Sequence, residues 1–349
     1  MKRILVTGAG GPPGVNFINS LRYSKEKMYI VGTDIDKMHL EWPNVDKAYL
    51  SPCRADNPKY LYFLNNLIEK ENIEFVHGQP DQECSFLSQN RNKIKAKTFL
   101  PNKKTVEICQ NKFKSAKIWL KKGIYKYNTY IINNKEDLKK ASKELGYPFW
   151  MRAAQGAGAR GSTLVENIDI GYYWLKYWQA RNIGWIFIAQ KYFEGRDFAF
   201  QSLWKDGKLI TSQARERLEY IYAFLSPSLH TGTPVIAKTV HDDRINEVST
   251  KAILAIDKKA TGIFCVDLKE DITDGNIYCT EINPARFFTT SFFFTKAGCN
   301  MPYYYVKMAY GEELPELKLY NALDKDIYYL RHIDCPTKLI KGEKWKAIV

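Results

Sequence analysis

Residues 262–268 read Gly-Ile-Phe-Cys-Val-Asp-Leu, residues 277–283 read Ile-Tyr-Cys-Thr-Glu-Ile-Asn, and between them stands Glu270-Asp-Ile-Thr-Asp-Gly-Asn276. The outer stretches are rich in β-branched, aromatic and apolar residues, which is typical of strands. Asp-Gly and Gly-Asn in the middle are a strong short signal for a hairpin turn. This region therefore predicts two antiparallel strands joined by a short connection.

One face of this predicted hairpin collects oxygen ligands. Side chains alternate along a strand, so Glu281 and Asn283 share a face, and a loop centred on residues 273–275 puts Asp267 directly across from Glu281. Two carboxylates and an amide suit Mg²⁺ bridging nucleotide phosphates, because Mg²⁺ takes few carboxylates and keeps positions open for phosphate oxygens. The alternative is a plain hairpin with polar residues on its wet side. The opposite face carries Phe264, Val266, Leu268 and Ile282, which we expect in a core.

Composition indicates an ordinary globular protein. The chain has 349 residues, 45% hydrophobic and 26% charged, which is enough for two or three packed units. Residues 1–8 read as a strand entering a glycine loop rather than a signal peptide. The most apolar stretch, residues 287–294, is too short to span a bilayer. The seven cysteines, an odd number without a Cys-x-x-Cys pair, argue against a disulfide scaffold and a zinc site. We therefore expect a cytoplasmic protein without a membrane partner.

The net charge of +14 is partly concentrated, with eleven Lys or Arg and one acid between Arg91 and Lys122. A nucleic-acid surface is one interpretation of this basic segment. We favour solvated helix faces, with some of the charges serving bound phosphates instead.

The order of predicted elements divides the chain. Residues 1–105 alternate strand and helix, which predicts an α/β, doubly wound domain with a parallel sheet. Residues 106–313 mix helices with antiparallel strands, and we expect a two-lobed α+β domain with a small lid lobe at about 125–195 and a larger lobe at about 196–313. Residues 314–349 form a C-terminal tail that the sequence does not place.

The chain has two glycine-rich loops, which indicate different functions. The first, Gly8-x-Gly10-Gly11-x-x-Gly14, follows a strand and opens a helix, as in dinucleotide-binding domains. An NAD(P)-dependent short-chain oxidoreductase or epimerase is therefore an alternative, although no Tyr-x-x-x-Lys pair in the chain is supported by a well-placed Ser. The second loop, residues 155–162, is built almost entirely of small residues and follows Arg152. Such a flap can close over phosphates and offer backbone N–H groups.

The order of these parts resembles the ATP-grasp superfamily. A doubly wound domain leads to Asn111-Lys112, then to residues 146–152, the small-residue loop, residues 190–195, and finally Asp267 with Glu281-Ile-Asn-Pro284. Within the superfamily the chain looks closest to one synthetase half of the carbamoyl-phosphate synthetase large subunit, and more distantly to biotin carboxylase. The resemblance covers about residues 1–310 and implies a pre-ATP-grasp domain followed by an ATP-grasp domain.

The resemblance also implies residue roles. Lys112 and Arg152 would hold the ATP phosphates, and one or two Mg²⁺ ions, or Mn²⁺ in their place, would bind Asp267, Glu281 and Asn283. The flap would use Gly156, Gly158 and Gly161. Adenine would meet Gln190, Lys191, Tyr192 and Phe193, and the ribose would meet Asp197. His230, in a His-Thr-Gly segment, would reach the phosphates; a loop or buried histidine is the alternative.

Three departures bear on the substrate. An amide, Gln190, stands where relatives usually carry an acid. Carbamoyl-phosphate synthetases have arginines where this chain has Ala285 and Phe288, and a single Arg286 is shifted by one position. A second synthetase half is absent from the chain. The displaced arginine puts bicarbonate in doubt as the substrate.

We expect an ATP-dependent, ADP-forming carboxylate–amine ligase that works through an acyl phosphate on small molecules, amino acids among them. Arg286 is the predicted carboxylate or acyl-phosphate ligand, because a planar fork suits such oxyanions. Arg215 and Arg217 are weaker candidates for the same pocket, with exposed strand positions as the alternative. Asp81 or Glu83 could hold the amine. A homodimer and a non-catalytic basic binding protein are further alternatives.

Overall fold

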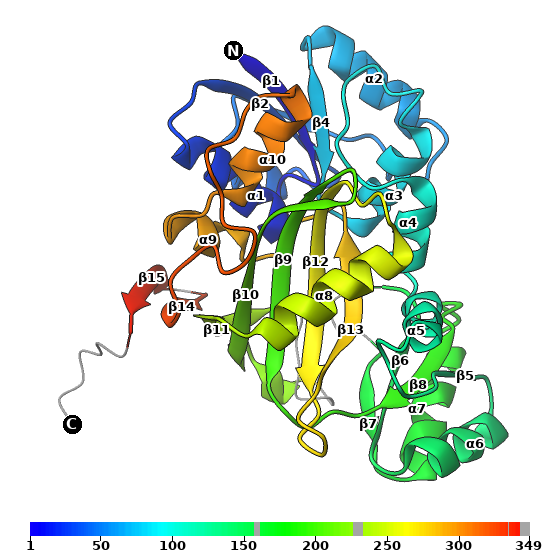
Figure 1. Ribbon diagram of the computed structural model, residues 1–349. Helices are drawn as coiled ribbons and strands as arrows, with labels where there is room; N and C mark the ends of the chain where they lie inside the picture. The colour runs from blue at the N-terminus through cyan, green and yellow to red at the C-terminus, as the bar shows by residue number, and fades with distance from the viewer. Residues whose placement is uncertain (157–160, 226–232, 334, 343–349) are drawn as a thin grey trace.

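The computed structural model describes residues 1–156, 161–225, 233–333 and 335–342. Three sheets follow one another along this part of the chain, and Figure 1 shows the largest of them at the centre of the molecule. No helix among the described residues is both long and apolar enough to cross a bilayer.

The N-terminal sheet is parallel, as expected. Its strands β1 (Lys2–Thr7), β2 (Met28–Asp34), β3 (Lys47–Leu50) and β4 (Phe75–Gly78) lie in the order β3-β2-β1-β4. Ile4 and Val6 pack with residues of α1 (Pro12–Tyr23), whereas Leu5 packs with residues of α2 (Tyr60–Lys70). Helices therefore cover both faces, which confirms the doubly wound prediction. Helix α3 (Asp81–Asn90) and a 3₁₀ turn, η1 (His39–Glu41), complete this unit.

The second sheet is small and antiparallel. Helices α4 (Lys103–Cys109) and α5 (Lys112–Lys121) lead into it. Its strands have the order β5-β8-β6-β7, and α6 and α7 pack against it. The bounds are β5 (Tyr130–Ile132), β6 (Phe149–Ala153), β7 (Thr163–Val165), β8 (Phe187–Lys191), α6 (Lys135–Leu145) and α7 (Ile168–Ala180). This unit lies within residues 125–195, where we expect the lid lobe, and its role as a lid remains a prediction.

The third sheet has seven antiparallel strands in the order β13-β12-β9-β10-β11-β14-β15. Its bounds are β9 (Asp197–Lys205), β10 (Lys208–Tyr220), β11 (Pro234–Val240), β12 (Gly262–Glu270), β13 (Ile277–Pro284), β14 (Ile327–His332) and β15 (Cys335–Lys341), with a 3₁₀ turn η2 (Ala223–Leu225). Helix α8 (Asp243–Ile256) crosses one face of it (Figure 1). The tail that the sequence did not place supplies β14 and β15, and β14 pairs with β11. The expected domain bounds at residues 105 and 313 remain predictions.

The predicted hairpin forms as expected. Asp267 pairs with Glu281, and Phe264, Val266, Leu268 and Ile282 lie together in the core beneath α8. The register slips by one residue beyond Asp267, because Leu268 pairs with Cys279 and leaves Thr280 as a bulge. Helices α9 (Ser291–Lys296) and α10 (Met301–Tyr310) then return the chain to the first domain, where they lie beside α1.

The loop after the hairpin is bound to the first domain by long-range hydrogen bonds. The Phe287 N–H donates to Gln79 Oε1 over 3.2 Å, and Asn16 Nδ2 donates to the Thr289 carbonyl over 2.5 Å. Asn300 Nδ2 donates to the Ser20 carbonyl over 2.8 Å. These bonds fix the segment that follows β13 onto the parallel sheet and its first helix.

One buried carboxylate makes the stability of the first domain depend on pH. Glu71, 3% exposed, accepts hydrogen bonds from the hydroxyls of Tyr49 and Tyr29 and from Lys47 Nζ. These donors lower the pKa of Glu71 to about 2. A pKa lowered in the folded state stabilises the fold above the unfolded pKa of about 4.5, and this contribution is lost as the pH falls toward 2.

We predict that Glu71→Gln lowers the unfolding free energy at pH 7 by on the order of 3 kcal/mol and flattens its fall between pH 5 and 2. Urea unfolding across that pH range measures both effects. Glu69→Gln is the control, since Glu69 is exposed and pairs with Lys95 on the surface. Equal pH profiles for the two variants would contradict the assignment.

Candidate active site

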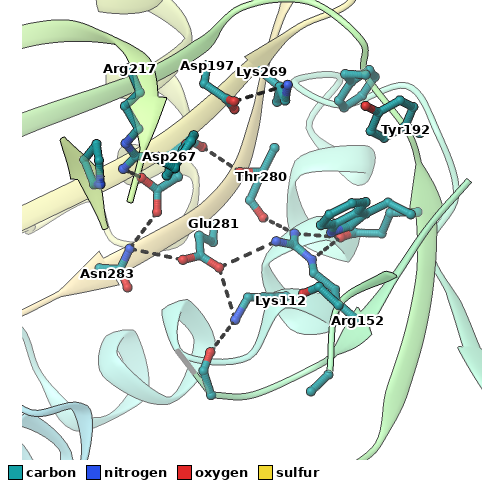
Figure 2. A pocket seen from close by; sticks show the side chains of 18 of the residues that line it. Lys112, Arg152, Tyr192, Asp197, Arg217, Asp267, Lys269, Thr280, Glu281 and Asn283 are labelled. Atoms are coloured by element: carbon teal, nitrogen blue, oxygen red, sulfur yellow. Dashed lines mark hydrogen bonds and ion pairs between the residues drawn. The ribbon is translucent and has the colours of Figure 1, made fainter. Parts of the chain in front are cut away.

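A single pocket lies between the small sheet and the seven-stranded sheet, and most of the predicted site residues that the structure describes line it (Figure 2). Its cavity volume is about 220 Å³. Residues of both sheets line it, so a ligand in this pocket would contact both lobes.

The predicted metal ligands meet on one wall. Asn283 Nδ2 donates to Asp267 Oδ2 over 3.0 Å and to Glu281 Oε1 over 3.3 Å. Asp267 also pairs with Arg217. Burial raises the pKa of Asp267 to about 6. Burial pushes the pKa of Glu281 upward too, but Lys112 and Arg152 outweigh it and lower this pKa.

Two cations face Glu281 from different elements. Lys112 begins α5, whose N-terminus Asn111 caps by accepting from the Lys114 N–H. Lys112 Nζ lies 3.1 Å from Glu281 Oε2 and donates to the Gly156 carbonyl over 2.9 Å. Arg152, on β6, lies 3.6 Å from the same carboxylate oxygen. Two positive charges thus surround one negative charge, which favours an anion such as phosphate beside them.

The Thr280 bulge contributes to this arrangement. Its carbonyl, freed from the strand ladder, accepts from Arg152 Nη2 over 2.6 Å, and its hydroxyl donates to the Asp267 carbonyl over 3.1 Å. Sequence reasoning missed Thr280, since the pattern of residues gave no sign of a bulge. It also missed Lys269, which alternation with Asp267 could have found; Lys269 Nζ lies 3.3 Å from Asp197 Oδ2.

The donor chemistry of this wall fits a divalent cation. Asp267 and Glu281 lie side by side, and one polar group, the Asn283 amide, bridges both carboxylates. The amide oxygen accepts from Arg286, so Asn283 would have to turn its amide to become a ligand. No cluster of three or more His, Cys, Asp or Glu residues suitable for a metal exists in the described chain. Two carboxylates alone suit Mg²⁺ that takes its remaining ligands from phosphate oxygens.

The flap is described only at its ends. Gly156 has φ +108° and open space where a Cβ would stand, whereas Gly161 has φ +76° and packs against the ring of Trp185. Gly158 and His230 lie outside the described residues.

The strand expected to receive adenine is largely occupied by its own contacts. Gln190 Oε1 accepts from Arg152 Nε over 2.9 Å, and Gln190 Nε2 donates to Thr129 Oγ1 over 3.2 Å. Phe193 stacks on Tyr278 with ring centroids 4.9 Å apart, and Tyr192 stacks on Trp150 at 6.0 Å. Lys191 Nζ donates to the Leu145 carbonyl over 3.4 Å. The Gln190 side chain therefore orients Arg152 in this structure rather than facing the pocket freely.

Three arginines line the other end of the pocket. Arg286 donates from Nε to Asp81 Oδ1 over 2.5 Å and also bonds Asn283. Ala285, with φ +64°, turns the chain before it. Arg215 is buried and Arg217 is half-buried, so the alternative of exposed strand residues is wrong. Phe288 lines the same end, whereas Phe287, Phe293 and Phe294 belong to the core.

The acids proposed for the amine have other partners. Asp81 pairs with Arg286, and Glu83 is buried and accepts from the Tyr60 hydroxyl over 2.6 Å. Of the basic segment between Arg91 and Lys122, Lys112 lies buried in the pocket, while Lys93, Lys95, Lys97, Lys103, Lys104, Lys114, Lys117, Lys121 and Lys122 are exposed.

The first glycine loop is packed against protein. A Cβ on Gly8 would lie 2.3 Å from the Pro80 ring, and one on Gly10 would lie 2.4 Å from the His39 carbonyl oxygen. The Gly10 N–H, which a dinucleotide-binding loop would offer to phosphate, donates to Asp34 over 3.1 Å. These glycines serve close packing, and the geometry gives no support to the NAD(P) alternative.

Comparisons with known proteins agree with this architecture. No family model matches the chain. The chain is similar to the carbamoyl phosphate synthase large chain of Clostridium acetobutylicum, with 21% identity over 348 residues covering 93% of this chain and 31% of that protein. The chain therefore spans about a third of the length of this curated relative.

Solved structures match over most of the chain. The biotin carboxylase domain of the 2-oxoglutarate carboxylase from Hydrogenobacter thermophilus, in complex with MgADP, ADP and bicarbonate, matches with TM-score 0.71 and 19% identity, covering 94% of this chain and 73% of that one. N5-carboxyaminoimidazole synthetase from Staphylococcus aureus, complexed with ADP, matches with TM-score 0.71 and 15% identity, covering 94% of this chain and 81% of that one. L-amino acid ligase from Bacillus licheniformis matches with TM-score 0.67 and 15% identity, covering 88% of this chain and 74% of that one. At such identities the likeness establishes the fold alone, and this fold is the one that the predicted resemblance implies.

We predict that Glu281→Gln removes the dependence of nucleotide binding on Mg²⁺. Calorimetric titration with a non-hydrolysable ATP analogue should show Mg²⁺ tightening binding to the wild-type protein by about tenfold or more, and binding to the variant by less than about twofold. The variant keeps Lys112 and Arg152, so metal-free binding should persist.

Glu270→Gln is the matched control, because Glu270 lies on the same hairpin but pairs with Arg196 over 2.8 Å, outside the pocket. A Glu281→Gln protein with an unchanged response to Mg²⁺ would exclude Glu281 as a metal ligand.

Proposed function

We propose that this protein is an ATP-dependent, ADP-forming carboxylate–amine ligase. The observation that carries the proposal is the half-buried carboxylate pair Asp267 and Glu281, set across one hairpin. Lys112 and Arg152 face Glu281 from two other elements. This arrangement offers metal ligands and phosphate-binding cations on the same wall of one pocket.

The reaction has two steps. A substrate carboxylate oxygen attacks the γ-phosphorus of ATP, the bond to the bridging oxygen breaks, and ADP leaves with the electron pair. The nitrogen of an amine then attacks the carbonyl carbon of the acyl phosphate, the carbon–oxygen bond breaks, and inorganic phosphate leaves while the nitrogen loses a proton. Positioning and charge neutralisation supply most of the catalysis in such phosphoryl transfers.

The residues of the pocket divide this work. Lys112 and Arg152 neutralise phosphate charge, and Gln190 holds Arg152 in place through its amide oxygen. Mg²⁺ bound by Asp267 and Glu281, with Asn283 after its amide turns, would supply further positive charge at the phosphates; we leave open whether Mn²⁺ can replace it. Gly156 and Gly161, at the ends of the flap, allow backbone to approach the nucleotide closely.

Arg286 orients the carboxylate in this proposal. It stands beside the metal face through its bond to Asn283, and Asp81 holds its guanidinium from the other domain. The shift of this arginine by one position, with Ala285 and Phe288 beside it, favours a carboxylate other than bicarbonate. The likeness to an L-amino acid ligase makes amino acids the first substrates to examine. A homodimer remains a prediction.

The proposal is tested by measuring ADP release with small carboxylates and amines supplied together. Substrate-dependent ADP formation, with an ¹⁸O atom passing from labelled carboxylate to inorganic phosphate, is the expected result. Transfer of ¹⁸O reports the acyl phosphate directly, because only that intermediate moves a carboxylate oxygen onto phosphorus. ADP release that no carboxylate stimulates would overturn the proposal.

We predict that Arg286→Gln lowers kcat/KM for the carboxylate by roughly 100-fold, since it removes a charged, two-pronged contact. The affinity for the ATP analogue should stay within about twofold of wild type. Arg196→Gln, which alters a half-exposed arginine outside the pocket, serves as the control. Equal losses in carboxylate and nucleotide affinity would instead assign Arg286 to the nucleotide.

A further inference from the structure

We infer that the carboxylate substrate carries a second anionic group, and that Arg215 binds this group at the end of the pocket away from the metal face. The identity of the first group as the reacting carboxylate rests on the proposed function. The presence of an oxyanion site at Arg215 does not.

Arg215 has a defined place on the sheet. It lies on β10, paired with Ala199 of β9, and Ala199 pairs in turn with Asp267 of β12. Two strand spacings, roughly 10 Å, therefore separate the Cα atoms of Arg215 and Asp267 along one row. The residue between them, Ala199, is fully buried. Arg215 and Arg217 share the face that lines the pocket.

Charge pairing leaves Arg215 unmatched. Apart from Lys191, which donates to the Leu145 carbonyl, the other cations of the described pocket wall face carboxylates. These pairs are Arg217 with Asp267, Lys112 and Arg152 with Glu281, Lys269 with Asp197, and Arg286 with Asp81. Arg215 is 1% exposed, and no acid of the described chain lies within ion-pair distance of it. Arg215 is therefore a buried cation without an anionic partner in the described structure.

The contacts that Arg215 does make are weak for a buried charge. It donates to the Thr290 hydroxyl, and its guanidinium lies 5.0 Å from the ring centroid of Phe288 and 5.7 Å from that of Phe294. Its Nε is buried without a hydrogen-bond partner in the described structure, as is the Nε of Arg217. The attraction of a cation to ring faces is weak compared with the cost of burying an unpaired charge. These contacts alone do not offset that cost.

Burial has a measurable consequence for the guanidinium. Desolvation, followed by the neighbouring charge of Arg217, lowers the pKa of Arg215 to about 9. An arginine that served only to stabilise the fold would be expected to have an acid or several carbonyl oxygens around it. The orphan Nε and the desolvated charge instead form a site for an oxyanion.

The second group is distinct from the reacting carboxylate because Arg286 and Arg215 lie at different places. Arg286 bonds Asn283 at the metal face, whereas Arg215 is displaced across β9 toward the centre of the sheet. A ligand that satisfies both needs an oxyanion at each end. A carboxylate and a phosphate share this chemistry, so the class is a small carboxylate with a second oxyanion.

The test compares matched ligands on the whole protein. Dicarboxylates from malonate to adipate, phosphonocarboxylates of the same lengths, and the corresponding monocarboxylates are titrated in the presence of Mg²⁺ and the ATP analogue, with binding followed by calorimetry. One length of dianion should bind the wild-type protein roughly 10- to 100-fold more tightly than its monoanion. The dicarboxylate and phosphonate arms identify which oxyanion the site takes.

Arg215→Met tests the residue. It should abolish the preference for the dianion, leave the affinity for the ATP analogue within about twofold, and leave the melting temperature equal or higher, because an unpaired buried charge is replaced by an apolar chain. Arg215→Lys, which keeps the charge, should retain part of the preference and provides the same comparison if the Met variant does not fold.

Arg91→Met is the matched control for stability. Arg91 also lacks an acid partner in the described structure, but its guanidinium donates to the carbonyls of Ser88, Leu100 and Pro101. Its replacement should therefore lower the melting temperature without changing ligand preference. A fall in melting temperature for Arg215→Met as large as for Arg91→Met, with ligand preference intact, would overturn the inference.

Two further outcomes separate this inference from the proposed function. Equal affinity for monoanions and dianions in the wild-type protein would overturn the inference that the substrate carries a second anionic group. Dianion binding that depends on Arg215, in a protein that releases no ADP with any carboxylate, would support the anion site while the ligase proposal fails.

Discussion

The antiparallel pairing of Asp267 with Glu281 is the constraint on which the pocket depends. It places two half-buried carboxylates side by side, where unpaired negative charge would be costly. Cations from three separate elements balance this negative charge: Lys112 from the start of α5, Arg152 from the small sheet and Arg217 from β10. The two lobes thus meet at this pair. Lys112 and Arg152, which balance the charge of Glu281 in the structure, are the cations that we propose for the nucleotide phosphates.

Much of this could be predicted from sequence because the deciding signals are local. The hairpin turn, the alternation that puts Asp267 and Glu281 on one face, and the alternating strands and helices of residues 1–105 each follow from short-range patterns. Strands β12 and β13 begin at Gly262 and Ile277, the first residues of the two predicted strands.

The remainder depends on contacts between distant residues. The burial of Arg215 follows from what covers the sheet, which alternation within β10 does not reveal. The Thr280 bulge, the pairing of Arg286 with Asp81, and the addition of β14 to β11 each join residues whose sequence gives no sign of one another. Gln190 also could not be placed from sequence alone. Its position in the chain predicted a contact with the nucleotide, whereas in the structure its side chain accepts a hydrogen bond from Arg152.

The hydrogen bonds that join residues 287–300 to Asn16, Ser20 and Gln79 have a consequence for motion. If the pocket opens, these bonds predict that the segment after β13 stays with the parallel domain and that the lobe carrying Arg152 moves. Four of the eight tryptophans (Trp150, Trp174, Trp178 and Trp185) lie in that lobe. Closure of the lobe on a nucleotide would then change the intrinsic fluorescence of the protein and give an optical signal without an attached dye.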